Sequence, residues 1–401
     1  HIHMGALSNI RVLDLTRVLA GPYCTMMLAD MGAEVIKIEI PGKGDDTRNF
    51  GPYKNKSSMY YANVNRNKKG VSLNMKAPEG KQLFLEMVKT ADMVVENYRP
   101  GVMDKLGLGY DVLKEVNPRI IYGAVSGFGC YGPYSERPGY DIIAQAMGGL
   151  MSITGPRGGK PCRSGSAMGD VLGGMNLTIG LLAALNARSI TGKGQRVDVA
   201  LVDSVVSSLE TGIQRYLVNH EIPERMGNEY AATYPYDSFK AKDKEFIIGC
   251  GNQGLFEKLL DLMGRKDLLE DSRFATLLER NKPENRIALG EIINDWTKNY
   301  NADELVDKIL GVGVPAAPIF DLHDVTTDEH LVKAREMLVD LPHPVIGPMQ
   351  VNGNPVKLMG TPVEITRHAP VVPGADNAEV YGGIFGLSGE RLRELSEKGV
   401  I

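Results

Sequence analysis

The stretch Ile10–Ile40, IRVLDLTRVLAGPYCTMMLADMGAEVIKIEI, decides the fold class. Apolar and charged residues alternate in Ile10–Leu15, which predicts a short strand. Gly21-Pro22 then opens a predicted helix of about ten residues, because proline suits the first helical turn. The largely apolar segment Ala33–Ile40 predicts a second strand. A strand, a helix and a strand within about thirty residues form a βαβ unit, so we predict a parallel sheet.

The same alternation continues toward the C-terminus and predicts one doubly wound α/β region. The expected strands lie at 93–97, 120–126 and 196–201, and the expected helices at 78–91, 110–116, 140–150, 172–187 and 203–218. Composition shifts at about His220, after which a strand at 245–249 and helices at 254–263 and 284–311 predict a smaller α+β region of about a hundred residues. A break near Asn301 is an open alternative for the second of these helices. A charged helix is expected at 388–398.

Composition narrows the function classes. The 401 residues carry 45 Lys and Arg against 49 Asp and Glu, a net charge of −4, which argues against a nucleic-acid or membrane-surface partner. The four cysteines lack CxxC spacing and fit reduced thiols better than disulfides or a zinc site. We find no apolar run of transmembrane length and no signal peptide before the first strand, and His1–His3 look like an expression scar. These features predict a soluble cytoplasmic protein.

Two stretches resemble ligand-binding motifs. Asn65–Lys76 places three cations before a short strand, which is typical of a solvated face and, less often, of an anion-binding loop. Gly127–Gly132 matches G-x-G-x-x-G after a strand, but Pro133 and Pro138 break the helix that a dinucleotide fingerprint requires. We interpret the second match as fortuitous, and no phosphate-binding P-loop is present in the sequence.

The stretch Arg163–Met175, RSGSAMGDVLGGM, puts one carboxylate, Asp170, between small residues and a long apolar segment. On residue type alone, Asp170 is best explained as a helix N-cap. The surrounding glycines, serine and alanine favour a functional role, because they would let a large substrate approach the backbone.

Elimination favours Asp170 as the reactive group. No Ser-His-Asp set can be assembled, and no histidine neighbours a cysteine or pairs at metal-ligand spacing. An aspartate kept ionised by a helix N-terminus can attack an activated thioester to give a mixed anhydride. Backbone N–H groups of glycine loops could hold the oxyanions. The segment 249–254 is a candidate lid of this type, although taken alone it is better explained as a plain turn at a strand end.

At this point the sequence resembles the class III CoA-transferases, the CaiB/BaiF or formyl-CoA-transferase-like family. The matching motifs run in family order through the first 254 residues: Val12–Thr16, Ala20–Pro22, Gly32–Glu39, Gly44-Asp45, Asn67–Lys69, Leu73–Lys76, Glu96-Asn97, Pro100-Gly101, Pro138–Asp141, Gly169-Asp170, Thr191–Gln195 and Gly249–Gln253. Each motif is weak alone, whereas the ordered set is specific.

The resemblance implies roles for individual residues. Asp170 falls on the family's catalytic aspartate, Tyr140 on an active-site aromatic, and Gly251 and Gln253 on a glycine lid. Positions that contact CoA in the family correspond to Arg17, Leu19, Ala20, Leu73, Asn74, Met75, Lys76, Asn97, Tyr98, Arg99, Lys105 and Arg137. Ile40 and Pro138 replace basic contacts of some members. The lid reads Gly-Cys-Gly-Asn-Gln, less glycine-rich than in oxalate-specific enzymes, which argues against oxalate as acceptor.

The resemblance also implies an interlocked homodimer. Each chain would contribute a Rossmann-like large domain from residues 4–219 and 331–401, with a small domain from residues 220–330 between them. The implied substrates are an acyl-CoA and a small carboxylic acid, with coenzyme A carried as the thioester and no metal.

Two alternatives stay open. An α-methylacyl-CoA racemase would resemble this chain around Asp170 but needs a histidine base, and the equivalent position is Tyr140, which is poorly matched to proton shuttling at neutral pH. A non-catalytic CoA-binding protein would use Asp170 only as a cap.

Overall fold

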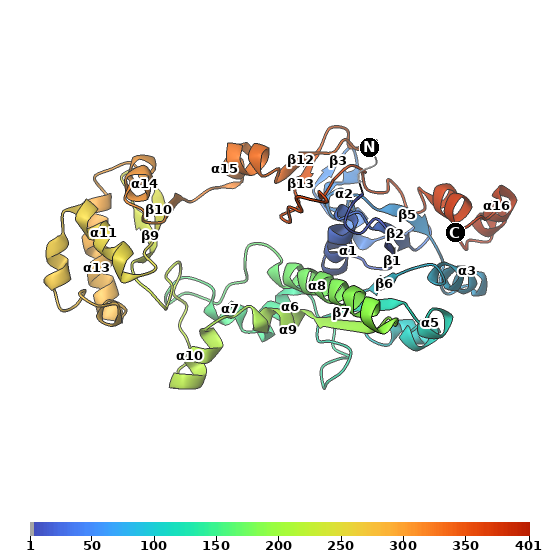
Figure 1. Ribbon diagram of the computed structural model, residues 1–401, viewed down its shortest axis with the longest axis horizontal. Helices are drawn as coiled ribbons and strands as arrows, with labels where there is room; N and C mark the ends of the chain where they lie inside the picture. The colour runs from blue at the N-terminus through green and yellow to red at the C-terminus, as the bar shows by residue number, and fades with distance from the viewer. Residues whose placement is uncertain (1–3) are drawn as a thin grey trace. The chain divides into compact units, whose positions relative to one another are not determined.

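The computed structural model describes residues 4–401, so the predicted expression scar His1–His3 lies outside the described residues. The chain divides into two compact units (Figure 1). The first unit contains the residues up to Leu150 together with 163–214 and 328–401, and the second contains 151–162 and 215–327. The short segment Met151–Cys162 therefore accompanies the second unit.

The first unit is built on a six-stranded parallel sheet, as the Ile10–Ile40 stretch predicts. Its strand order is β5-β2-β1-β6-β7-β8, and every neighbouring pair runs parallel. The order reverses between β1 and β6, so the chain winds outward in both directions from the middle of the sheet. The strands are β1 (Arg11–Asp14), β2 (Glu34–Glu39), β5 (Lys69–Ser72), β6 (Met93–Glu96), β7 (Ile121–Ser126) and β8 (Arg196–Ala200).

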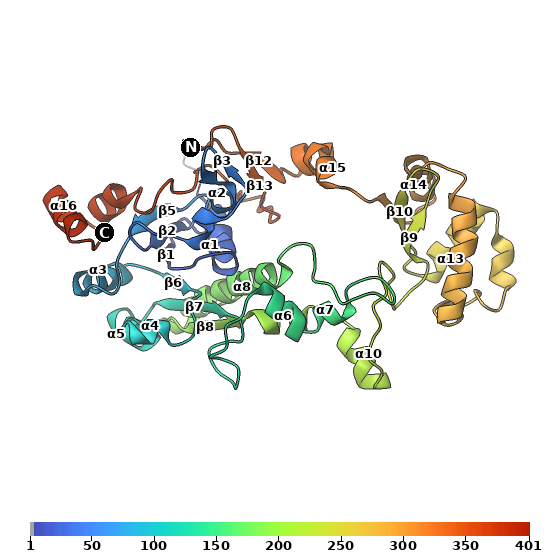
Figure 2. The same cartoon turned by 180° about the vertical axis from the view of Figure 1, so that it is seen from behind.

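Helices cover both faces of this sheet (Figures 1 and 2). On one face α1 (Ala20–Asp30) and α8 (Met168–Thr191) pack side chains such as Cys24, Leu177 and Leu181 against the strands. The other face carries α3 (Pro78–Val88), α5 (Tyr110–Val116), the π-helix Ala378–Ile384 and α16 (Gly389–Glu397). The Tyr381 hydroxyl donates to the Ser72 carbonyl at 2.8 Å, so the end of the chain is fixed to β5.

Two cations of the run Asn65–Lys76 are not solvated. Arg66 and Lys68 are fully buried. Arg66 pairs with Asp30 at 2.8 Å and Lys68 with Asp14 at 3.1 Å. The solvated-face prediction is wrong for these two residues, because buried carboxylates from β1 and α1 neutralise them inside the core, and the anion-binding alternative for the segment stays a prediction.

Several predicted helices are divided in the structure. The helix expected at 203–218 is α9 (Leu201–Ser207) followed by α10 (Gly212–Asn219), and the one expected at 140–150 is α6 (Asp141–Met147) followed by α7 (Leu150–Ile153). Turns and bends, with no helix, follow β7 until Asp141, in agreement with the rejection of a dinucleotide fingerprint. The first unit is completed by α2 (Met59–Val64), α4 (Val102–Lys105) and two small hairpins, β3–β4 (Tyr53–Lys54, Ser57–Ser58) and β12–β13 (Leu338–Asp340, Gln350–Asn352).

Helix α8 is longer and more apolar than expected from the sequence. By length and composition alone it could cross a membrane, which corrects the statement that no apolar run reaches that length. Of its most apolar window, 39% is buried within this chain. The rest of this apolar helix is partly buried or exposed on the first unit, with Met175, Ile179 and Ile190 among the exposed residues.

The second unit has a core of its own. Its antiparallel sheet, in the order β11-β10-β9, packs on helices through residues such as Phe246, Phe256 and Ile293. The helix expected at 284–311 is broken between Thr297 and Ala302. The elements are β9 (Tyr236–Lys240), β10 (Glu245–Gly249), α11 (Gln253–Met263), α12 (Leu277–Arg280), α13 (Pro283–Thr297), α14 (Ala302–Gly311), β11 (Ala316–Pro318) and α15 (Leu322–Thr327).

Candidate active site

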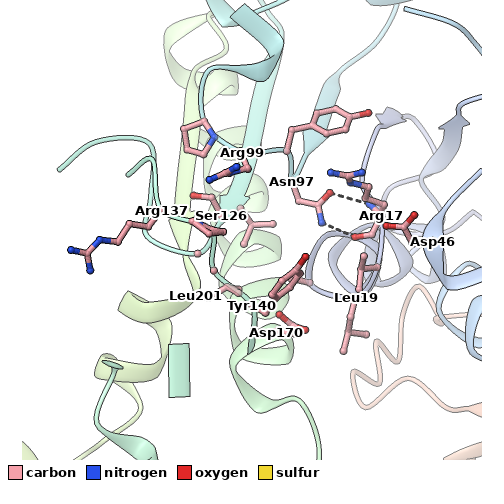
Figure 3. A pocket seen from close by; sticks show the side chains of 18 of the residues that line it. Arg17, Leu19, Asp46, Asn97, Arg99, Ser126, Arg137, Tyr140, Asp170 and Leu201 are labelled. Atoms are coloured by element: carbon pink, nitrogen blue, oxygen red, sulfur yellow. Dashed lines mark hydrogen bonds between the residues drawn. The ribbon is translucent and has the colours of Figure 1, made fainter. Parts of the chain in front are cut away.

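A cavity of about 420 Å³ opens in the first unit where the chain leaves the carboxyl ends of β1, β6, β7 and β8 (Figure 3). Ligands of open α/β sheets bind at this edge, where the strand order reverses, because the outgoing loops part there. Its lining residues are Arg17, Val18, Leu19, Ala20, Asp46, Phe50, Asn97, Tyr98, Arg99, Pro100, Val125, Ser126, Gly127, Arg137, Pro138, Gly139, Tyr140, Asp170 and Leu201.

The cavity collects most of the residues that the sequence predicted for the site in this unit. Those that line it are Arg17, Leu19, Ala20, Asn97, Tyr98, Arg99, Arg137, Tyr140 and Asp170. Leu73, Asn74, Met75, Lys76 and Lys105 are not among its lining residues. The side chains of Leu73 and Met75 belong to the buried core under α3, which leaves their backbone as the part able to meet a ligand.

Gly251 and Gln253 belong to the second unit. Gln253 begins α11, and its amide is already bonded at both ends: Nε2 donates to the Ala275 carbonyl at 3.0 Å, and Oε1 accepts from Arg280 at 2.7 Å. Gly251 meets no neighbouring atom at the position of an added Cβ. The lid role that the resemblance implies for this loop stays a prediction.

Asp170 is the third residue of α8, and it does not cap the helix. The N-cap position is Ala167, which provides no side-chain hydrogen bond. The capping interpretation of Asp170 is therefore wrong, since the chain becomes helical two residues before it. Its carboxyl group lines the cavity instead.

The protonation of Asp170 also differs from the expectation. Burial, and then the negative charge of Asp141, raise the pKa of its carboxyl group to about 7, and within residues 4–401 no cation offsets these effects. The helix start thus does not keep the carboxyl group fully ionised at neutral pH. Burial, and then the Asp170 charge, raise the pKa of Tyr60, on α2, to about 12.

The small residues around Asp170 serve packing more than substrate access. An added Cβ on Gly173 would lie 2.5 Å from Leu201, and one on Gly174 would lie 2.6 Å from the Ala20 carbonyl oxygen. These two glycines let α8 approach α9 and α1 closely, which holds the first turn of α8 at the cavity. Packing therefore explains Gly173 and Gly174, while approach of a substrate to the backbone stays a prediction for the residues before Asp170, where Gly165 has no atom within 4 Å of an added Cβ.

Positive charge lies around the cavity. Arg17 stacks over the Tyr98 ring at 5.3 Å, and Arg99 donates to the Glu136 carbonyl at 3.0 Å. Arg137 stacks on Tyr134 at 3.8 Å, and in Figure 3 its side chain points away from Asp170. Three arginines on the loops of one cavity suit a polyanionic ligand.

Sequence reasoning missed the residues that shape this cavity. Asn97 was predicted as a ligand contact, yet its side-chain amide is bonded to the backbone of Arg17 (Figure 3). Val18 has a positive φ of 71°, which no sequence pattern indicates. Asp46, Phe50, Ser126 and Leu201 also line the cavity without having been predicted. Among the residues near the site that were not predicted, Asp141 could have been found from the sequence, because it directly follows Tyr140 in the motif Pro138–Asp141.

Comparisons with known proteins identify the family of the chain. The sequence model of CoA-transferase family III matches residues 7–377. The chain is 40% identical to an acetyl-CoA:oxalate CoA-transferase of Acetobacter aceti over 89% of this chain and 90% of that protein. It is also 40% identical to a succinyl-CoA:mesaconate CoA-transferase of Haloarcula hispanica, over 92% of this chain and 94% of that protein. A crystal structure of a CaiB/BaiF family protein from Brucella suis superposes with a TM-score of 0.82 at 37% identity, covering 94% of this chain and 99% of that one.

Proposed function

The chain belongs to CoA-transferase family III and moves CoA from an acyl-CoA thioester to a carboxylic acid, and from that premise we propose that Asp170 carries the CoA between the two acids. The observation that carries the proposal is the position of the Asp170 carboxyl group in a cavity that Arg17, Arg99 and Arg137 also line. The racemase and the non-catalytic alternatives lose their support, because the similar proteins are CoA-transferases and Asp170 does not cap its helix.

The first half of the proposed reaction consumes the donor. A carboxylate oxygen of Asp170 attacks the thioester carbonyl carbon, the C–S bond breaks, and CoA leaves as a thiolate beside a mixed anhydride. The thiolate then attacks the aspartyl carbonyl of that anhydride. The donor acid leaves as a carboxylate, and Asp170 becomes a CoA thioester.

The second half reverses these steps with the acceptor. The acceptor carboxylate attacks the aspartyl thioester carbonyl, which gives a second anhydride and frees the CoA thiolate. The thiolate attacks the acceptor's carbonyl carbon, so that the new acyl-CoA forms and the Asp170 carboxylate is restored. No proton is consumed, and the burial of Asp170 protects both anhydrides from water.

Charges at the cavity support the binding of acyl-CoA. Arg17 and Arg99 extend from loops after β1 and β6, where they could meet the phosphates of CoA, and Arg137 follows β7. Tyr140 is 74% exposed at the cavity, so it is available to contact the acyl group. We expect the acceptor to be a short dicarboxylic acid, since the relatives described above are named for oxalate and mesaconate. The less glycine-rich lid favours a dicarboxylic acid other than oxalate.

We also propose that the enzyme is a cytoplasmic homodimer. Met175, Ile179 and Ile190 of α8 are 43%, 63% and 78% exposed and share one side of the helix. Ile142 and Met147 add exposed apolar surface on α6. A second copy of the chain would bury this surface, as the interlocked dimer of the family implies, and the four free cysteines suit a reducing compartment.

The experiment is to mix the enzyme with succinyl-CoA or acetyl-CoA and a panel of acids, then quench and identify the Asp170 peptide by mass spectrometry. We expect a CoA adduct on Asp170, its loss together with turnover in Asp170→Ala, and retained CoA binding in that variant. Asp203→Ala is the matched control, because Asp203 is an exposed aspartate in the first turn of α9. Full turnover by Asp170→Ala would rule the mechanism out.

A further inference from the structure

A chain of hydrogen bonds that the proposed reaction does not use begins at the backbone of Asp170. The Asp170 N–H donates to Oδ1 of Asp141 at 3.1 Å. Asp141 is the first residue of α6, directly after Tyr140. Its other oxygen, Oδ2, accepts from Nε2 of Gln145 at 2.8 Å. Both oxygens of one carboxylate are thus used to connect α6 with the first turn of α8.

The chain continues through Gln145 to the loop that precedes α8. Gln145 is fully buried, and its Oε1 accepts from the Ser164 N–H at 2.9 Å and lies 3.2 Å from the Ser164 hydroxyl. That hydroxyl also donates to the Ser166 carbonyl at 2.7 Å. A buried amide whose bonds are satisfied in this way fixes the geometry of the groups around it. Two side chains of α6 therefore hold the segments that lead to Asp170. Gln145 holds the loop 164–166, and Asp141 holds the start of α8.

Gly169 makes room for this arrangement. A Cβ atom added there would lie 2.8 Å from Oδ1 of Asp141, closer than atoms of this kind approach. The glycine before Asp170 is thus explained by the carboxylate of Asp141. A larger residue at position 169 would displace the oxygen that accepts from the Asp170 N–H, so Gly169 and this hydrogen bond belong to one arrangement.

The two carboxylates also interact through charge. Tyr60 of α2 and Tyr140 lie near the Asp170 carboxyl group, and Arg17, Asp46, Arg99 and Arg137 line the same cavity, but the charge that raises its pKa is that of Asp141. A more basic carboxylate is a stronger nucleophile once it has lost its proton. Asp141 thus makes the Asp170 carboxylate more reactive while its hydrogen bond fixes the backbone that carries it.

We propose that Asp141, supported by Gln145, is a positioning residue for the Asp170 carboxyl group. It fixes the first turn of α8, and Gln145 fixes the loop 164–166. The Asp170 carboxyl group thereby stays aligned through thioester attack and anhydride collapse. This inference rests on the proposed role of Asp170. It assigns to Asp141 and Gln145 no contact with the substrate. Misplacement of a reacting group by about 1 Å can cost on the order of a hundredfold in rate.

The test compares Asp141→Asn, Gln145→Leu and the control Asp203→Asn with the unmodified enzyme. Succinyl-CoA is the probe, steady-state turnover gives kcat and KM, and the rate at which the CoA adduct forms on Asp170 is followed in single turnovers from pH 5 to pH 9. We expect kcat to fall about tenfold or more in both α6 variants, while KM for succinyl-CoA changes by less than about threefold. In Asp141→Asn the midpoint of the acid limb should also move to lower pH, and Asp203→Asn should match the unmodified enzyme.

The outcomes separate this inference from the proposed function. If the unmodified enzyme forms no adduct on Asp170, the proposed function fails and the inference fails with it. If the adduct forms but both α6 variants keep the unmodified rate and pH midpoint, only the inference is overturned. Should Asp141→Asn not fold, Gln145→Leu decides alone by the kcat-to-KM comparison, because it keeps Asp141 in place.

Discussion

The Asp45 carboxylate accepts a hydrogen bond from the backbone N–H of Val18 at 3.1 Å, and Val18 is held at a φ of 71°. A β-branched residue in this left-handed region is strained by about 1–3 kcal/mol. Asp45 is itself buried, and its other oxygen pairs with the buried Lys37 at 2.8 Å. An ion pair of the core therefore fixes a strained residue in the wall of the candidate active site.

Val18→Gly should separate stability from binding. Glycine removes the strain but loses chain entropy on folding and part of the valine's packing, so we expect the free energy of unfolding to change by less than about 1 kcal/mol. The loosened wall should raise the Kd for acyl-CoA several-fold. Urea denaturation and calorimetric titration measure the two quantities. Unchanged affinity would show that the conformation of Val18 does not matter for the ligand.

Asn97→Ala should weaken the site through the backbone of Arg17. Asn97 Oδ1 accepts from the Arg17 N–H at 3.0 Å, and Nδ2 donates to the Arg17 carbonyl at 2.6 Å. Loss of two bonds worth about 1 kcal/mol each should lower the free energy of unfolding by about 1–2 kcal/mol and raise KM for acyl-CoA roughly tenfold. Denaturation and steady-state kinetics test this. If KM rises while stability is unaltered, Asn97 contacts the ligand directly instead.

Asp170→Asn should change how stability depends on pH. The folded-state pKa of about 7 lies above the ordinary aspartate value of 3.8, so between these two pH values the folded state binds a proton that the unfolded state has lost. The unmodified enzyme should therefore lose stability as pH rises from 4 to 7, by an amount on the order of a few kcal/mol from this group. Asp170→Asn should lack this component. Urea denaturation of both proteins at pH 4.5 and pH 8 checks the prediction, and equal pH dependence would contradict it.

Ile179→Asp should dissociate the proposed dimer, because a charge would be placed in the apolar strip of α8. We expect sedimentation velocity to show a monomer, with the far-ultraviolet circular dichroism unaltered. Val112→Asp is the control, since Val112 is exposed on α5, which covers the opposite face of the sheet. A dimer that survives Ile179→Asp would place the interface elsewhere.

The sheet was predictable because its pattern is local. Ile10–Ile40 gave strand, helix and strand within one or two residues of β1, α1 and β2, since apolar periodicity and turn residues act over short distances. The ordered motifs also brought Arg17, Asn97, Tyr140 and Asp170 to one cavity, because residues after parallel strands gather at one edge.

Tertiary partners explain what could not be predicted. Arg66 and Lys68 resembled a solvated run, and only the folded chain brings Asp30 and Asp14 to them. Gly173 and Gly174 resembled a substrate approach, whereas they meet Leu201 and Ala20. The altered pKa of Asp170 likewise depends on burial and on Asp141, 29 residues away in sequence. Each of these three features depends on a contact between segments that lie far apart in the chain, and no local sequence pattern indicates such a contact.

The attachment of the C-terminal segment to β5 has a consequence for biosynthesis. The six strands of the central sheet are complete once residue 200 has been made, but Val380, Tyr381 and Leu395 complete the core on one of its faces. At 5–20 residues per second, the ribosome needs roughly 10–40 s to make the intervening chain. During that interval α3 and α5 already pack on this face, but the apolar surface that Val380, Tyr381 and Leu395 later cover stays open. We therefore expect chaperones that bind apolar surfaces to raise the yield of folded enzyme, and slow translation of the second unit to lower it.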